Sequence, residues 1–326
     1  MSGLKAFFEA RQQSMIELLT ATVERESPTH EKAAVDALSQ YLKDQLEAIG
    51  AEVDVHPREH VGDLLLATWN GDAEGKPILI VSHMDTVHPL GSVAERPVRL
   101  EDDGRLYGPG ALDMKGGIVV AIDALAGLRE RNELPARPIQ FLITTDEEKG
   151  SRYSRELIEE LAADAALVMV TEPPTRDGSL KTWRKGVSSY RLTIQGRAAH
   201  AGNEPEEGVN AIIEFAQHAL ELNKLNDLPN GTSVSVTVVN GGTTTNVIPA
   251  QVNAAIDVRV MSQPVYEKLH AEIMDRMPFI PGADVTIERL HYRPPMERDG
   301  DAFGERCRRR AWAFPHFPAR SIGEEG

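Results

Sequence analysis

Cysteine is almost missing from this chain, because Cys307 is the only one among 326 residues. A single cysteine excludes an intrachain disulfide and any metal site built from cysteine thiolates. Proteins without disulfides are typical of reducing compartments, so the expected location is the cytoplasm.

Long apolar runs and an excess of positive charge are missing as well. No stretch is long enough to span a bilayer, and the N-terminus carries no apolar segment of signal-peptide length, so we expect no membrane partner. Acidic residues number 50 against 35 basic ones, which gives a formal net charge of −15. Because phosphate binding needs a basic surface, nucleic acid is not expected as a partner either.

The chain does have alternating helical and strand patterns, over a length that favours two domains. In its first part the hydrophobic periodicity predicts helices over residues 4–25, 31–49, 118–130 and 154–162. It predicts strands over residues 51–55, 64–69, 77–80, 138–145 and 165–170, the last of them buried. Residues 26–31 break the first helix and are expected to cap the second. This order of elements predicts an α/β domain with a mixed sheet.

One of these strands delivers a histidine and an aspartate at its C-terminal end. His83 and Asp85 follow the apolar run 77–80, and residues two positions apart on an extended segment point to the same side. An imidazole can ligate a metal while a carboxylate holds its other ring nitrogen. Taken alone, such a pair is most often just two ordinary polar residues at a strand end.

Four further acidic residues stand at or near the ends of predicted elements. Glu147 and Glu148 end the strand 138–145, Glu172 ends the strand 165–170, and Asp113 lies at the start of the helix 118–130. Each has an ordinary reading, as a helix-capping aspartate or as solvated loop charge. Together at one sheet edge they would create an unfavourable negative field unless cations were present, which indicates divalent metal. Histidine with carboxylates suits zinc, manganese or cobalt, and argues against calcium or magnesium.

These residues stand in four ordered motifs, which are Ser-His-Met-Asp-Thr-Val, Gly-Pro-Gly-Ala-Leu-Asp-Met-Lys-Gly-Gly, Asp-Glu-Glu-Lys-Gly-Ser and Thr-Glu-Pro. With them the chain resembles the dinuclear zinc hydrolases. This family includes glutamate carboxypeptidase, acetylornithine deacetylase, succinyl-diaminopimelate desuccinylase, aminoacylase and peptidase T. The resemblance extends over nearly the whole chain. It implies a mixed-sheet zinc-peptidase catalytic domain with an inserted ferredoxin-like lid and dimerisation domain.

The resemblance also implies a role for each residue of the strand-end set. Two divalent ions are implied, zinc first, with cobalt or manganese as alternatives. Their ligands would be His83, Asp113, Glu148 and Glu172, with Asp113 bridging the two ions. Asp85 would orient His83, and Glu147 would be the general base. The implied reaction is cleavage of an amide or peptide bond by a metal-bound water, in a small N-acylamino acid or at a C-terminal residue, as in glutamate carboxypeptidase.

The second domain is predicted from its own pattern. Strands are expected over residues 190–196, 233–239, 254–260 and 283–289, and helices over 208–222 and 265–277. Antiparallel strands with two helices on one face favour a ferredoxin-like sandwich. The apolar side of the first helix is expected to consist of Val209, Ile212, Ile213, Phe215, Ala216 and Leu220. We expect a catalytic part over residues 1–184, the lid over 185–290, and an incomplete return to the catalytic domain over 291–326.

The lid carries the expected substrate contacts. By resemblance, His200 would reach the active site of a partner subunit in a homodimer and stabilise the oxyanion, and Asn246 would contact substrate. Arg259 and Lys181 would grip a free carboxylate of the substrate. The residues alone leave two alternatives open, an exposed loop position for His200 and a structural ion pair for Arg259.

The C-terminal part departs from the pattern of the family. A glycine-rich loop and a late histidine ligand are expected there, but His291 and His316 do not stand in that context, and the segment 306–317 is unusually basic and aromatic. The alternative hypothesis is therefore a truncated, catalytically impaired homologue that acts only in binding or dimerisation. A count of two bound zinc ions would favour the enzyme, and a count of none or one would favour the alternative.

Overall fold

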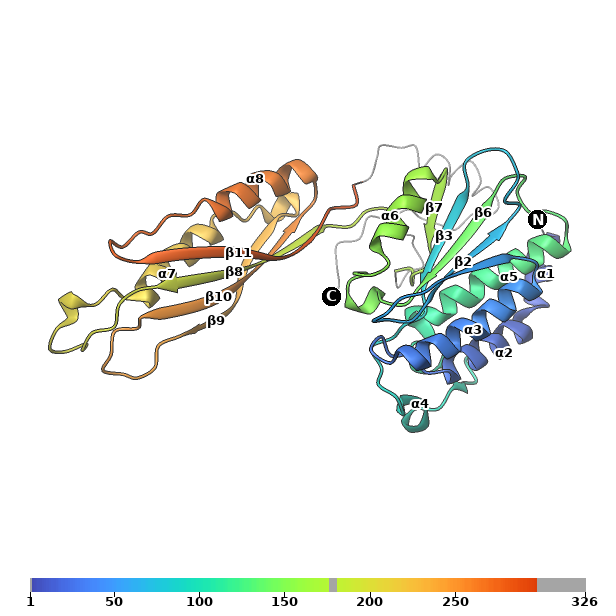
Figure 1. Cartoon of the computed structure of the whole chain (residues 1–326), viewed down its shortest axis with the longest axis horizontal. Coiled ribbons are helices and arrows are strands. Elements are labelled where there is room, and N and C mark those ends of the chain that lie inside the picture. The colour runs from blue at the N-terminus through green and yellow to red at the C-terminus, as the bar shows by residue number, and fades with distance from the viewer. Residues whose placement is uncertain (1, 176–180, 298–326) are drawn as a thin grey trace. The chain divides into compact units, whose positions relative to one another are not determined.

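The computed structural model describes residues 2–175 and 181–297 (Figure 1). The chain divides into two compact units, Met1–Pro173 and Pro174–Gly326. Among the described residues, no helix has both the length and the apolar character needed to cross a membrane.

The first unit is built on a five-stranded mixed sheet. Its strands, in spatial order, are β1 (Glu52–His56), β2 (Leu64–Trp69), β6 (Ile139–Thr144), β3 (Ile78–His83) and β7 (Leu167–Val170). β3 lies parallel to both β6 and β7, whereas β2 is antiparallel to β1 and β6. A small separate hairpin is formed by β4 (Arg99–Leu100) and β5 (Leu106–Tyr107). This confirms the mixed sheet expected from the sequence.

Helices cover both faces of this sheet (Figure 1). The helices of this unit are α1 (Ser2–Glu9), α2 (Gln12–Glu24), α3 (Lys32–Ala48), α4 (Ser92–Glu95), α5 (Gly116–Glu130) and α6 (Arg155–Asp164), of which α4 lies apart from the sheet. On one face, α3 and α5 pack against side chains that include Leu65 and Phe141. On the other face, α6 packs against Leu64 and Leu142. Adjacent residues of one strand thus pack against helices on opposite faces of the sheet, because side chains alternate along a strand.

Two expectations for this unit are wrong in detail. The helix expected over residues 4–25 is broken between α1 and α2. Arg11 stands at the break, and its guanidinium forms ion pairs of 2.8 Å with Asp123 and with Glu130 of α5. These two ion pairs, one with the buried Asp123 and one with the exposed Glu130, hold the Arg11 side chain against α5 at the break.

The strand expected to be buried over residues 165–170 is the second exception. In β7, Val168, Met169 and Val170 are 38%, 41% and 59% exposed. β7 is the last strand of its sheet, and within the described part of the chain no strand pairs with its outer edge. β7 therefore has the apolar composition that is typical of an interior strand, although it stands at an edge of its sheet.

The second unit is a four-stranded antiparallel sheet with two helices. Its elements are β8 (Gly186–Gln195), α7 (Ala211–Asn223), β9 (Ser233–Gly241), β10 (Gln251–Val260), α8 (Gln263–Met274) and β11 (Asp284–Arg293). The strand order is β11-β8-β10-β9. This β-α-β-β-α-β arrangement confirms the ferredoxin-like sandwich. The return to the catalytic domain expected over residues 291–326 falls mostly outside the described residues and stays a prediction.

The helix α7 turns a different face to the core than the sequence predicts. Ile212, Ile213 and Leu220, expected on the buried side, are 41%, 51% and 68% exposed. Glu214 and His218, one turn apart on the same helix, are fully buried. The apolar side expected for α7 is therefore wrong for these three residues.

Hydrogen bonds explain why a carboxylate can occupy the core here. Glu214 accepts the backbone N–H of Phe279 at 2.9 Å and of Ile280 at 2.7 Å, and it lies 2.8 Å from Nε2 of His218. A buried carboxylate with this many partners avoids the cost of an unpaired buried charge. Burial lowers the pKa of His218, although the adjacent Glu214 opposes this shift. The pair ties α7 to the segment that follows α8.

Candidate metal centre and active site

Parallel strands bring the predicted site residues to one edge of the first sheet. His83 at the end of β3 is in register with Thr144 at the end of β6, and Glu147 is the third residue after β6. After β7, the N–H of Thr171 donates to the carbonyl of Val81 at 3.1 Å, which brings the following Glu172 to the same edge. The carboxyl ends of parallel strands are where open α/β sheets place ligands.

A short helical turn, η1 (Ala111–Lys115), carries Asp113 into this region. The Sδ atom of Met114, in the same turn, accepts the backbone N–H of His83 at 3.2 Å. The absence of a side chain at Gly117 allows the start of α5 to pack against Thr171, because a Cβ at this position would overlap the carbonyl oxygen of Thr171. The Asp113–Met114 peptide bond is cis.

The Nε2 atom of His83 lies at the centre of the acidic groups. It is 3.2 Å from Oδ1 of Asp113, 3.4 Å from Oε1 of Glu172 and 3.9 Å from Oε2 of Glu147. Two sets of donor atoms lie within 4.8 Å of one another, His83 with Glu147 and Glu172, and His83 with Asp113 and Glu148. One imidazole with carboxylates and no thiolate fits zinc, manganese or cobalt.

Asp85 fixes the other side of the imidazole. The Nδ1 atom of His83 lies 3.0 Å from the backbone oxygen of Asp85 and 3.3 Å from its Oδ1. Asp85 is fully buried and also accepts the backbone N–H of Glu147 at 3.2 Å and of Glu148 at 3.3 Å. Nδ1–H donating to Asp85 leaves Nε2 for a metal, which is how carboxylates orient ligating histidines.

The pKa values of His83 and Glu148 reflect the negative charge that surrounds them. Burial by itself lowers the pKa of His83, but hydrogen bonds to Asp113, Asp85 and Glu172 outweigh it and raise the pKa to about 12. The pKa of Glu148 is also raised, first by burial and then by the charge of Asp113. Without a metal the imidazolium of His83 thus supplies positive charge among the carboxylates. A divalent cation would neutralise the same field more fully.

Lys115 is a buried charged residue to which the sequence patterns assign no role. Only 1% of the residue is exposed, and Nζ donates to the carbonyls of Thr22 at 3.1 Å and Arg25 at 2.8 Å. These carbonyls lie at the C-terminal end of α2, where they lack partners within the helix. Burial lowers the pKa of Lys115 to about 7. Through these two hydrogen bonds, Lys115 attaches its own turn, which also carries Asp113, to the end of α2.

The expected cap of the second helix is also wrong. α3 begins at Lys32 with Glu31 as its N-cap, and Glu31 makes no capping hydrogen bond through its side chain. The hydroxyl of Thr29 instead donates to Oδ2 of Asp85 at 2.8 Å. Nothing in the local pattern of residues 26–31 could reveal this contact, because the two residues are 56 positions apart.

In the second unit, the structure brings His200 and Asn246 together. The N–H of Ala201 donates to the carbonyl of Asn246 at 2.9 Å, so the two loops run side by side. His200 is exposed, and its Nδ1 accepts the backbone N–H of Gly202 at 3.2 Å and of Asn203 at 3.0 Å. An accepting Nδ1 assigns the proton of the neutral ring to Nε2, which is therefore a hydrogen-bond donor.

Arg259 lies at the other end of the same sheet. It is the second-last residue of β10 and stands eight positions after Gln251, the first residue of that strand. Eight positions correspond to about 27 Å along an extended strand. Its Nε lies 2.8 Å from Oδ1 of Asp257, so the structural ion pair considered from the sequence is present. Lys181 is exposed and precedes β8.

Of the two late histidines, His291 is described by the structure and belongs to neither set of donor atoms. His291 lies in β11 of the second unit, exposed, and its carbonyl accepts the hydroxyl of Ser188 at 2.9 Å. His316 lies outside the described residues.

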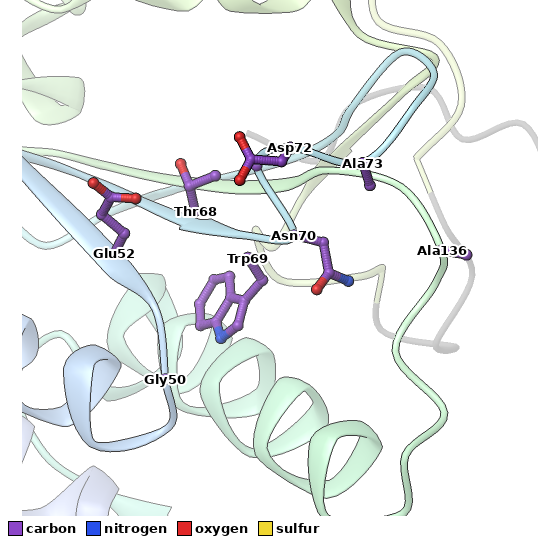
Figure 2. Close-up of a pocket in the computed structure, with 9 residues that line it drawn as sticks. Gly50, Glu52, Thr68, Trp69, Asn70, Asp72, Ala73 and Ala136 are labelled. Carbon is purple, nitrogen blue, oxygen red and sulfur yellow. The ribbon is translucent and has the colours of Figure 1, made fainter.

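A hollow of about 670 Å³ lies at the opposite edge of the first sheet (Figure 2). Its lining comes from the start of β1 and the end of β2, including Glu52, Thr68 and Asp72. Trp69 at the end of β2 is in register with Ile139 at the start of β6, whereas the metal cluster follows the other end of β6. This hollow therefore belongs to a different surface from the candidate active site.

Comparison with known proteins agrees with the geometry. Residues 79–306 match the model of peptidase family M20/M25/M40. Carboxypeptidase G2 from Pseudomonas sp. (strain RS-16) is 33% identical over 288 residues, which cover 87% of this chain and 69% of the relative. Succinyl-diaminopimelate desuccinylase 2 from Shewanella loihica (strain ATCC BAA-1088 / PV-4) is 31% identical over 255 residues, which cover 73% of this chain and 65% of the relative. The chain thus spans about two thirds of the length of these relatives.

Solved structures share the fold. A tripeptidase from Staphylococcus aureus subsp. aureus mu50 and aminopeptidase PepT from Bacillus cereus ATCC 10987 superpose with TM-scores of 0.76 and 0.78. Each is 24% identical, and each match covers 97% of this chain and 85% of the other. With the family model and the sequence relatives, they confirm the resemblance and the expected class, a metal-dependent hydrolase of amide or peptide bonds. The chain belongs to peptidase family M20/M25/M40.

Proposed function

We propose that this chain is a zinc-dependent carboxypeptidase or deacylase that cleaves the amide bond next to a free carboxylate. Its substrate would be a small N-acylamino acid or the C-terminal residue of a peptide. The observation that carries the proposal is the convergence of four carboxylates on the imidazole of His83, with donor atoms in two sets suited to two metal ions. The match to M20 hydrolases favours this function over the alternative of an inactive binding protein.

Each residue of the candidate metal centre has a separate role in the proposed hydrolysis. His83 and Glu172 would hold one ion, Glu148 the other, and Asp113 would lie between them. When bound, the metals supply Lewis acidity, which polarises the scissile carbonyl and acidifies water. Glu147 would take the proton from that water and hand it to the leaving amine. Zinc rather than cobalt or manganese, and residence in the cytoplasm, stay predictions.

Substrate contacts are proposed for the second unit. The planar guanidinium of Arg259, helped by Lys181, suits the free carboxylate of the substrate. His200 would donate from Nε2 to the oxyanion, beside Asn246. Because the length of β10 separates Arg259 from the His200 loop, we assign the two groups to different active sites. A homodimer would then complete each site with His200 and Asn246 of the partner subunit.

An exposed apolar surface on α7 and β9 supports the homodimer. Ile212 and Ile213 on α7 are 41% and 51% exposed, and Val239 on β9 is 52% exposed on the helix-covered face of the sheet, since it pairs with the buried Ala254. β9 is an edge strand, so its outer backbone groups can also pair with a second chain. We propose that two copies associate through these elements, because exposed apolar surface of this kind marks protein interfaces.

Ile213→Glu is expected to dissociate this homodimer. A charge at the centre of an apolar contact costs desolvation energy with no partner to offset it. Sedimentation velocity should show a shift from dimer to monomer, together with lower activity because His200 of the partner is lost. Met277→Lys is the matched control, since Met277 is 75% exposed but lies after α8. A wild-type monomer, or a variant that stays dimeric, would contradict the proposed interface.

The proposed function is tested with a substrate panel. We expect zinc-loaded protein to hydrolyse N-acylamino acids or peptides that end in a free carboxylate, and to turn over the matching C-terminal amides much more slowly. Release of the amino acid, followed by a ninhydrin or coupled assay, gives the rates. Glu147→Gln is the control for a contaminating hydrolase. No turnover of any member of the panel would favour the binding-protein alternative.

A further inference from the structure

The short segment Ser27–Thr29, between α2 and α3, lies along the residues that follow β3. The hydroxyl of Ser27 donates to the carbonyl of Met84 at 2.6 Å. The N–H of Thr86 donates to the carbonyl of Ser27 at 2.9 Å, and the N–H of Thr29 donates to the carbonyl of Thr86 at 3.3 Å. These contacts fix the segment beside the backbone on both sides of Asp85.

Within this segment, Thr29 places a hydroxyl directly on the carboxylate of Asp85. The distance from Oγ1 to Oδ2 of Asp85 is 2.8 Å, and Thr29 and Asp85 are 3% and 0% exposed. A hydroxyl that donates to a carboxylate makes a charge-assisted hydrogen bond, which is stronger than one between neutral groups. Burial of both groups keeps water from replacing the hydroxyl.

The Asp85 carboxylate has four donors around it, two for each oxygen. Oδ1 faces Nδ1 of His83 at 3.3 Å and the N–H of Glu147 at 3.2 Å. Oδ2 faces the N–H of Glu148 at 3.3 Å and the hydroxyl of Thr29 at 2.8 Å. A carboxylate offers about four lone-pair sites, so this set fills its capacity.

Three of these four donors belong to residues that themselves take part in the candidate metal centre. Thr29 is the exception, since it comes from the N-terminal segment and has the shortest of the four distances. The Asp85 carboxylate contacts Nδ1 of His83 beside the Asp85 backbone oxygen, and it accepts the backbone N–H groups of Glu147 and Glu148. A donor from outside that group can hold the carboxylate in place whether or not the centre is loaded.

We propose that Thr29 is a positioning residue of the metal centre. Its hydroxyl fixes the Asp85 carboxylate, and through it the imidazole of His83 and the strand-end turn that carries Glu147 and Glu148. This inference rests on the proposed function, and it adds a residue from the N-terminal segment to a centre otherwise built from later parts of the chain.

Thr29→Val tests this role, because valine keeps the shape of threonine and removes only the hydroxyl. Zinc affinity of the metal-free protein, measured by competition with a chromophoric chelator, is expected to fall about 10- to 100-fold, as for other partners of metal ligands. kcat is expected to fall while KM for the substrate changes little, because Thr29 does not touch substrate. Thr29→Ser keeps the donor and should restore both zinc affinity and kcat.

Thr22→Val is the matched control. Thr22 is also buried, and its hydroxyl donates to the carbonyl of Leu18 within α2 at 2.7 Å, away from Asp85. Thr22→Val removes a hydrogen bond between neutral groups, so it should lose less stability in urea than Thr29→Val and should keep wild-type zinc affinity. Wild-type zinc affinity in Thr29→Val, an equal loss in Thr22→Val, or failure of Thr29→Ser to restore binding would overturn the positioning role.

Glu172→Gln separates this result from a failure of the proposed function. If zinc affinity falls in Glu172→Gln but not in Thr29→Val, the metal centre stands and the role of Thr29 is wrong. If neither variant changes zinc affinity, the proposed metal centre itself is wrong, and the positioning role falls with it.

Discussion

Substitution of Glu147 by glutamine is expected to lower kcat by about 10²- to 10⁴-fold, the usual contribution of a general base. Glutamine keeps the size of the side chain but cannot accept a proton at neutral pH. The N–H of Glu147 that donates to Asp85 is a backbone group, so this contact survives the substitution. The steady-state rate of the best substrate from the panel, measured with saturating zinc, gives the change in kcat.

Glu148→Gln is the informative comparison, because it makes the same chemical change at the next residue. Glu148 belongs to the donor set with His83 and Asp113, and its role as a ligand predicts a loss of bound metal. Glu147→Gln should instead retain nearly all of its zinc, as measured by atomic absorption after gel filtration. Full activity in Glu147→Gln would assign the base to another residue. Metal loss in Glu147→Gln but not in Glu148→Gln would reverse the two roles.

Removal of the metal is expected to abolish activity, and reloading with zinc is expected to release a proton from His83. In the metal-free fold the pKa of His83 is raised from 6.5 to about 12, so the ring is an imidazolium near neutral pH. Ligation requires the neutral ring. Titration calorimetry at pH 7.5 in buffers of different ionisation enthalpy should therefore report release of about one proton for the ion that His83 binds. A binding enthalpy independent of the buffer would contradict this assignment.

The same shift fixes how the effect of zinc on stability depends on pH. A folded pKa above the unfolded value means that protonated His83 stabilises the metal-free protein fully below about pH 6.5. This contribution is lost as the pH rises toward 12. Because zinc must displace this proton from the folded protein, the gain on loading zinc should increase with pH throughout the range below about pH 12, and it reaches about 4 kcal/mol where free zinc exceeds Kd by about 1,000-fold. Urea unfolding with and without zinc at pH 6.5 and 8.5 measures it.

The strand-end set could be predicted because its geometry depends on local patterns. Apolar runs identify β3, β6 and β7, and parallel strands put their carboxyl ends at one edge of the sheet. His83, Glu147 and Glu172 then come together without further information. The two-residue spacing of His83 and Asp85 likewise follows from the extended backbone.

Contacts between distant segments could not be predicted in this way. Thr29 in its local context predicts a helix cap, and only the folded chain shows that its hydroxyl reaches Asp85, 56 positions later. Lys115 follows Asp113 of the candidate metal centre by two positions, yet its ammonium group donates to backbone carbonyls at the end of α2. In both cases the tertiary partner decides the role, and the sequence pattern does not name that partner.

Periodicity also does not say which surface an apolar stripe will cover. On α7 the pattern correctly identified a helix, but Ile213 and Leu220 are exposed while Glu214 and His218 are buried. The carboxylate of Glu214 is stable in the core because Phe279 and Ile280 supply backbone donors. Those donors come from a segment some 65 positions later, which no window around α7 contains.

The open edge of β7 has a consequence for anyone who prepares this chain. Leu167–Val170 contains only apolar side chains, three of them more than a third exposed, and carries no charge, proline or bulge to discourage pairing. Natural edge strands use such features to prevent aggregation. During expression and concentration, this strand is therefore the part of the first unit most prone to recruit extended segments of other molecules.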